Sequence, residues 1–220
     1  MNVGFEIAGE PVYQALVWAG LQMTVRIAVF SYLLAFLIGN VIAAMRVSPV
    51  PILRRIGAIY TVYFRNTPLI VLAILFWVGG GRAGWPFGRV TTAIVVLGMY
   101  TGAYIAESLR SGINAVPPGQ AEAARAIGLP FTGVVGRIVL PQAIRTVIPP
   151  LGNLWIANLK NTSVFLVIGI NELTRSGYRI GLDSSRYVAA LSIVGVVYLL
   201  LVYGSAQVIK LLERRLEIAR

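Results

Sequence analysis

Five long apolar stretches, separated by short polar and basic segments, dominate the pattern of this chain. A membrane-spanning helix needs about 20 mostly apolar residues, and each stretch is that long. We therefore predict an all-α polytopic membrane protein, with residues 1–220 forming one transmembrane domain. The five spans are expected at about 22–44, 54–79, 90–109, 147–170 and 188–210. Residues 12–20 are also apolar, but adding them would make the first span too long for a bilayer of about 30 Å. We expect them to form a separate short helix at the membrane interface.

Composition agrees with a location in the bilayer. Hydrophobic residues make up 57% of the 220 residues, compared with about 45–50% apolar usage in globular domains. The formal net charge of +11 comes from basic residues between and beside the apolar stretches, which is typical of a membrane protein rather than a nucleic-acid-binding one. The sequence has no Cys and no His. We therefore predict no catalytic residues and no metal site.

The distribution of Lys and Arg predicts the orientation. Cytoplasmic loops carry the excess of basic residues. One side of the predicted topology carries the larger set, which is Arg46, Arg54, Arg55, Arg110, Arg125, Arg137, Arg145, Lys210, Arg214, Arg215 and Arg220. The other side carries Arg82, Arg89, Arg175, Arg179 and Arg186. The N-terminus is thus expected outside, and the C-terminus and the loop over residues 111–146 inside.

That cytoplasmic loop predicts two short helices. Pro117-Pro118-Gly119 ends the preceding element and lets a new helix start, and Gly128 stands where a left-handed residue would end it. Leu129-Pro130 opens a second helix that we expect to run toward Leu140 and to meet Pro141. Isolated helices shorter than roughly 12–15 residues are marginal in water, so packing against another surface must hold these two.

The residues of the first short helix suit helix-in-groove recognition of a partner. Ala123 and Ala124 allow close approach, and Glu122 and Arg125 can make directional contacts at the rim. On loop chemistry alone, a solvated connection between two spans is the stronger interpretation.

Polar and charged residues interrupt the second and fourth spans. A charge at the bilayer centre costs about 2.5–3.5 kcal/mol on insertion scales, so Arg65 and Lys160 should face a cavity or a partner. The residues near them could line a path for a zwitterionic or anionic solute, and they are Asn66, Thr67, Asn158, Asn161, Thr162 and Ser163. A structural role for Arg65 and Lys160 at helix ends is an equal alternative.

Three further patterns concern packing. Pro68 lies inside the second span and favours a bend beside Arg65. Glu107 and Arg110 are three residues apart and predict a local ion pair. Gly98 and Gly102 form a small-xxx-small pattern that favours close helix packing.

The spacing of the loop residues is the most specific signal in the chain. Glu122-Ala123-Ala124, three residues, Gly128, nine residues and then Ile138-Val139-Leu140-Pro141 resembles the signature loop of the membrane subunits of ATP-binding-cassette (ABC) importers. Arg65-Asn66-Thr67-Pro68-Leu69, Gly102 to Glu107, and Lys160-Asn161-Thr162-Ser163 are similar to the polar amino acid subfamily. Ala106 to Asn114, together with Gly119 to Arg125, is most similar to the glutamate permease subunits of actinobacteria. Many relatives carry an acidic residue where this chain has Asn161.

The resemblance implies a type I importer permease with a cytoplasmic coupling helix, in a bacterial plasma membrane. It also implies the partners, which are a second permease subunit, identical or related, an external amino acid binding protein, and a cytoplasmic ABC ATPase dimer that holds ATP and Mg. The chain has no G-x-x-x-x-G-K-[ST] phosphate loop, so we expect no ATPase activity and no bound cofactor in this subunit. The expected substrate is glutamate, aspartate or a related polar amino acid. Alternatives are glutamine, basic amino acids, or, in a different class, a channel or membrane-anchoring assembly protein.

Overall fold

A computed structural model of the protein describes residues 9–216, with side chains as far as Arg214. Arg220 and the side chain of Arg215, which the orientation prediction uses, lie outside the described residues. The α-helices are α2 (Pro11–Val47), α3 (Pro51–Asn66), α4 (Leu69–Ile74), α5 (Gly80–Arg82), α6 (Arg89–Asn114), α7 (Pro118–Ala126), α8 (Phe131–Val134), α9 (Leu140–Asn161), α10 (Leu173–Ser184) and α11 (Tyr187–Leu216). Two π-helical turns, η1 (Leu75–Gly79) and η2 (Val135–Val139), and the 3₁₀ helix η3 (Thr162–Ile168) connect them.

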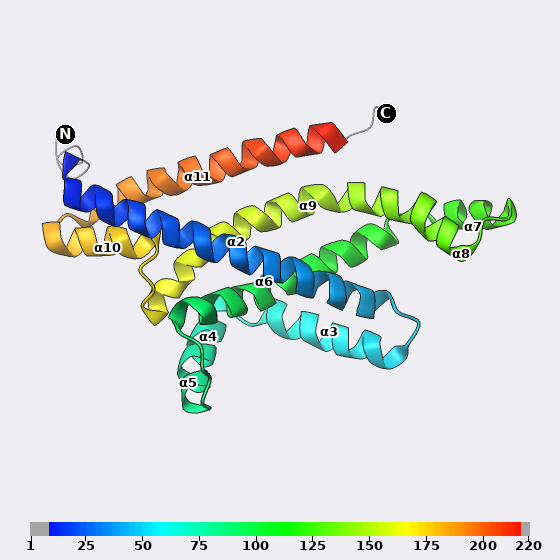
Figure 1. Ribbon diagram of the computed structural model, residues 1–220, viewed down its shortest axis with the longest axis horizontal. Helices are drawn as coiled ribbons and strands as arrows, with labels where there is room; N and C mark the ends of the chain where they lie inside the picture. The colour runs from blue at the N-terminus through cyan, green and yellow to red at the C-terminus, as the bar shows by residue number, and fades with distance from the viewer. Residues whose placement is uncertain (1–8, 217–220) are drawn as a thin grey trace.

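The long helices α2, α6, α9 and α11 run roughly lengthwise through an elongated bundle (Figure 1). At one end lie α7 and α8, and at the other lie α10 and the start of α2. Within the described residues, four helical segments are long and apolar enough to cross a membrane, and a bent pair gives up to five. The predicted all-α polytopic fold is confirmed.

The first helix corrects one prediction. Residues 12–20 do not form a separate short helix, because α2 runs unbroken from Pro11 to Val47. Gly20 does not end the helix; it is buried where α2 approaches α10, and a methyl group there would meet the Leu173 backbone at 3.0 Å. At 1.5 Å per residue, α2 is about 55 Å long, so it exceeds the thickness of a bilayer.

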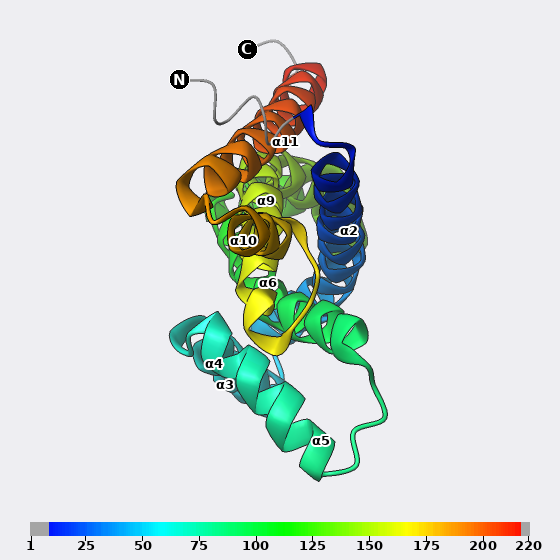
Figure 2. The same ribbon diagram turned by 90° about the vertical axis from the view of Figure 1, so that its left-hand side faces the viewer.

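The second predicted span, 54–79, is also not one straight helix. It breaks between Asn66 and Leu69, and the segments on either side meet at a bend of 102°. Thr67 is extended, with φ −98° and ψ 126°, because a residue before proline is pushed away from helical geometry. Pro68 is then the N-cap residue of α4. The bend expected beside Arg65 is therefore present, and α4 and α5 project away from the bundle (Figure 2).

The helix after the predicted coupling loop, residues 111–146, begins earlier than the sequence suggested. The second short helix does not stop at Pro141, since α8, η2 and α9 follow one another without a loop as far as Asn161. The wider π turn directly before α9 accommodates Pro141 in the first turn. Beyond η3, the helix α10 was not predicted at all.

Packing between α2 and α6 forms the centre of the bundle. A methyl group at Gly98 would lie 2.8 Å from Leu34 Cδ2, and one at Gly102 would lie 3.2 Å from the Ala35 carbonyl oxygen. A side chain at either position would press against α2, so the close packing predicted from the small-xxx-small pattern is confirmed. The buried core continues from Ile27 to Phe165 of η3.

Candidate functional site

The predicted coupling loop contains α7, which begins and ends where the sequence predicts. Pro117 is extended and Pro118 occupies the first turn of α7, where a missing N–H costs least. Gly128 has φ +87°, so it is left-handed. The Gly128 N–H donates to the Arg125 carbonyl at 2.9 Å, and the Leu129 N–H donates to the Ala124 carbonyl at 3.1 Å. This is a complete Schellman motif, which fixes the direction in which the chain leaves α7.

The five predicted coupling residues divide into two groups. Glu122, Ala123, Arg125 and Gly128 are exposed, whereas Ala124 is buried. Because α7 contacts α8 and η2, Ala124 supports the loop from within. The four exposed residues remain available to a partner.

Two apolar residues of the loop were missed by the sequence reasoning. Ile127 is 80% exposed and Phe131 is 76% exposed, and they stand on either side of Gly128. An aromatic or aliphatic side chain that fills a pocket at the centre of an interface can anchor it. The signal that could have found them is their position, since both lie within three residues of Gly128, which ends the first short helix.

A second candidate site surrounds Glu107 on α6, which meets arginines from three helices. Arg46 of α2 contacts Glu107 Oε2, and Arg65 Nη1 of α3 lies 3.6 Å from the same oxygen. Arg110 Nη2 donates to Glu107 Oε1 at 2.5 Å, so the predicted local ion pair is present. One carboxylate thus faces three guanidinium groups, which leaves an excess of positive charge.

Arg65 lies directly before the bend in the chain. It is the most exposed arginine of the three, with 42% of its side chain accessible, and its Cζ lies 5.4 Å from the centre of the Tyr104 ring. The neighbouring Asn66 and Thr67 side chains donate to carbonyls of their own helix, those of Val62 and Tyr63, each at 2.8 Å. Of these three predicted pathway residues, only Arg65 carries a charge, and that charge is partly exposed although it also pairs with Glu107.

The other predicted pathway residues lie on α9 and η3, and they differ in how far they are buried. Asn158 is 0% exposed, and its amide joins three helices. Its Oδ1 accepts from the Thr101 hydroxyl at 2.9 Å, and its Nδ2 donates to the Ala28 carbonyl at 2.9 Å and to the Ser31 hydroxyl at 3.1 Å. Thr162 is buried too, and its hydroxyl donates to the Leu159 carbonyl.

The remaining members of that group are accessible. Lys160 is exposed, Asn161 and Ser163 are partly exposed, and the Ser163 hydroxyl donates to the Lys160 carbonyl at 2.8 Å. Among the described residues, no hydrogen bond or ion pair joins the group at Arg65 to the group at Lys160. Residues 9–214 also contain no cluster of three His, Cys, Asp or Glu side chains that could hold a metal ion.

Comparison with known proteins decides the family. The family model described as "Binding-protein-dependent transport system inner membrane component" matches residues 31–218. The chain belongs to this family. It is a permease subunit of an amino acid ABC importer, a multi-pass protein of the plasma membrane and not an enzyme.

Relatives of this permease transport several amino acids. It is 44% identical to a glutamate transport system permease protein of Corynebacterium efficiens over 163 residues, which cover 68% of this chain and 71% of the relative. It is 32% identical to the arginine transport system permease protein of Bacillus subtilis over 199 residues, which cover 90% and 91%. A crystal structure of an amino acid ABC transporter with histidines has a chain with a TM-score of 0.87 and 32% identity, over 92% of this permease and 95% of that chain.

Proposed function

We propose that this permease imports acidic amino acids, glutamate or aspartate. The observation that carries the proposal is the excess of arginine over carboxylate at Glu107, with Arg65 partly exposed beside the bend in the chain. Lys160 adds a further exposed cation. Cationic groups on a solute path favour anionic solutes, because they stabilise a passing carboxylate. The similarity to glutamate permeases supports the same choice.

Glutamine and basic amino acids are the alternatives, since relatives named for glutamine and arginine cover most of the chain. Asn161 argues against a basic substrate. An acidic residue at that position would supply a negative charge to attract a cationic side chain, and Asn161 supplies none.

Competition experiments test the substrate class. Proteoliposomes that contain the permease, its ATPase and its binding protein should take up labelled glutamate. An excess of unlabelled glutamate or aspartate should abolish this uptake, whereas glutamine and arginine should reduce it much less. Stronger competition by arginine than by aspartate would refute the acidic class.

We further propose that the end of the bundle with α7 faces the cytoplasm, with the N-terminus outside and the C-terminus inside. There Glu122, Ala123, Arg125 and Gly128 face one protomer of an ATPase dimer that binds ATP and Mg. Ile127 and Phe131 insert into the ATPase as apolar anchors. A second permease subunit, identical or related, and an external binding protein complete the importer.

Docking is tested by capture of the ATPase on the permease in nanodiscs. Ile127→Ser and Phe131→Ser should each reduce capture. Ile52→Ser is the matched control, because Ile52 is 59% exposed near the same end of the bundle but lies on α3. Equal capture by all three variants would exclude the two side chains as anchors.

A further inference from the structure

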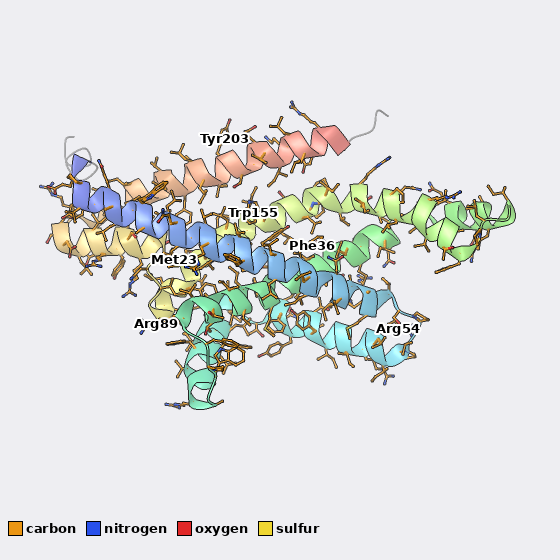
Figure 3. All side chains as sticks on the ribbon, viewed as in Figure 1. Met23, Phe36, Arg54, Arg89, Trp155 and Tyr203 are labelled. Carbon is orange, nitrogen blue, oxygen red and sulfur yellow. The ribbon has the colours of Figure 1, made fainter. Side chains whose placement is uncertain are left out.

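A group of arginines lies at the opposite end of the bundle from the coupling loop. Arg89 begins α6 (Figure 3), and Arg175 and Arg179 lie one turn apart on α10. Gly169, which is left-handed with φ +83°, lies between Arg89 and Arg175. A methyl group at Gly169 would lie 3.6 Å from Arg89 Cζ and 3.7 Å from Arg175 Nη1. Two guanidinium groups therefore approach the same point of the backbone.

These arginines have no carboxylate partner within residues 9–214, where the ion pairs all belong to Glu107. Glu172 is close in sequence, but its carboxylate is buried and accepts from the backbone N–H groups of Thr174 and Arg175 and from the Tyr198 hydroxyl. Like charges that are held together without an opposite charge repel each other. An anion placed between them would relieve that repulsion.

The structure also provides space beside these charges. A cavity of about 480 Å³ is lined by Arg175 and Arg179 together with Leu166, Asn171, Tyr178 and Leu182. A second cavity of about 130 Å³ shares Asn171, Arg175 and Arg179. Ligand pockets of about 300–1,000 Å³ that combine apolar walls with a few polar groups are typical of small-molecule sites. The larger cavity is therefore big enough for an amino acid.

We propose that Arg89, Arg175 and Arg179 form an entry site that binds the carboxylates of an acidic amino acid at the outer end of the permease. The proposal rests on the proposed function, which supplies both the orientation and the substrate class. A guanidinium group binds a carboxylate through two parallel hydrogen bonds, and Asn171 and Tyr178 add polar groups of the same cavity. The site would receive the substrate before it reaches the deeper cations Arg65 and Lys160.

Charge-removing variants with a matched control test the entry site. Arg89→Gln and Arg175→Gln remove one charge each from the site, and Arg82→Gln removes the same charge from exposed α5, on the same predicted side of the membrane. Binding of labelled L-glutamate and L-glutamine is measured on the permease in nanodiscs without binding protein. We expect Arg89→Gln and Arg175→Gln to weaken glutamate binding by about tenfold, the loss of one charge-assisted contact. Glutamine binding and Arg82→Gln should stay within about twofold of the wild type.

A charge-retaining variant and a change of lipid distinguish substrate binding from other roles of these arginines. Arg175→Lys retains the charge and should keep more of the affinity than Arg175→Gln, so equal losses in the two variants would contradict a charge-based site. The binding assay is repeated in phosphatidylcholine with and without phosphatidylglycerol. An effect confined to phosphatidylglycerol would assign the arginines to a lipid phosphate and overturn the proposal.

Wild-type uptake separates this proposal from the proposed function. One outcome is that wild-type proteoliposomes import glutamate while Arg89→Gln and Arg175→Gln bind it with the same affinity as Arg82→Gln. In that case the entry site is wrong and the proposed function stands. If the wild type imports no acidic amino acid, the proposed function itself fails.

Discussion

Replacing Gly128 by alanine tests whether the left-handed turn of the coupling loop is needed for binding to the ATPase. Gly128 has φ +87°, and an added methyl group would meet no atom within 4 Å, so the substitution acts only through the backbone. The left-handed conformation costs a residue with a side chain about 1–2 kcal/mol. If this strain opposes the docked shape of the loop, affinity for the ATPase should fall by about 5- to 30-fold.

Gly136→Ala is the matched control, because a methyl group there would also meet no atom within 4 Å while the backbone remains helical. The affinity of the ATPase for each variant in nanodiscs can be measured by biolayer interferometry, together with the number of ATP molecules hydrolysed per glutamate imported. Gly128→Ala should weaken docking and raise that ratio, and Gly136→Ala should do neither. Indistinguishable values for the two variants would refute the reasoning that the left-handed turn presents α7 to the ATPase.

Three further substitutions probe other parts of the structure. Asn158→Ala should lower the free energy of unfolding by about 2–3 kcal/mol, because it removes the buried hydrogen bonds that join α9 to the Thr101 hydroxyl and to the Ala28 carbonyl. Asn153→Ala on the exposed face of α9 is the control in thermal melts, and equal shifts would contradict this role. Lys160→Met should lower glutamate uptake at normal expression, and unchanged uptake kinetics would leave Lys160 only a structural role. Burial raises the pKa of Glu172, so the contribution of Glu172 to stability should be fully present below the exposed Glu pKa of about 4.3 and should be lost as pH rises through its native pKa. Glu172→Gln should flatten that loss in detergent melts, and parallel pH profiles would show the assignment to be wrong.

The sequence predicted those features that local pattern controls. Apolar length predicted the long helices, and Pro118 and Gly128 predicted where α7 starts and stops. Gly98 and Gly102 predicted a close helix contact, although the partner helix could not be named. Pro68 predicted a bend but not its angle of 102°, which depends on how α4 packs against η3 and α6.

Features that depend on contacts between distant residues could not be predicted. Only Arg110 is local to Glu107; Arg46 and Arg65 reach it because α2 and α3 pack against α6. Asn158 was grouped with the solute path, whereas the structure turns its amide toward α2 and α6. In a helix that is apolar on most faces, periodicity does not reveal which side faces the core. The length of α2 was underestimated because a bilayer limit was applied to a helix that extends past it.

The most direct test of the proposed function is uptake of labelled L-glutamate into proteoliposomes that contain the permease, its ATPase and its binding protein, with and without ATP. We predict accumulation only when ATP, Mg and the binding protein are all present, and competition by unlabelled aspartate. Equal flux with and without ATP would contradict an ATP-driven importer, and ATP-driven uptake that aspartate does not compete for would contradict the acidic substrate class.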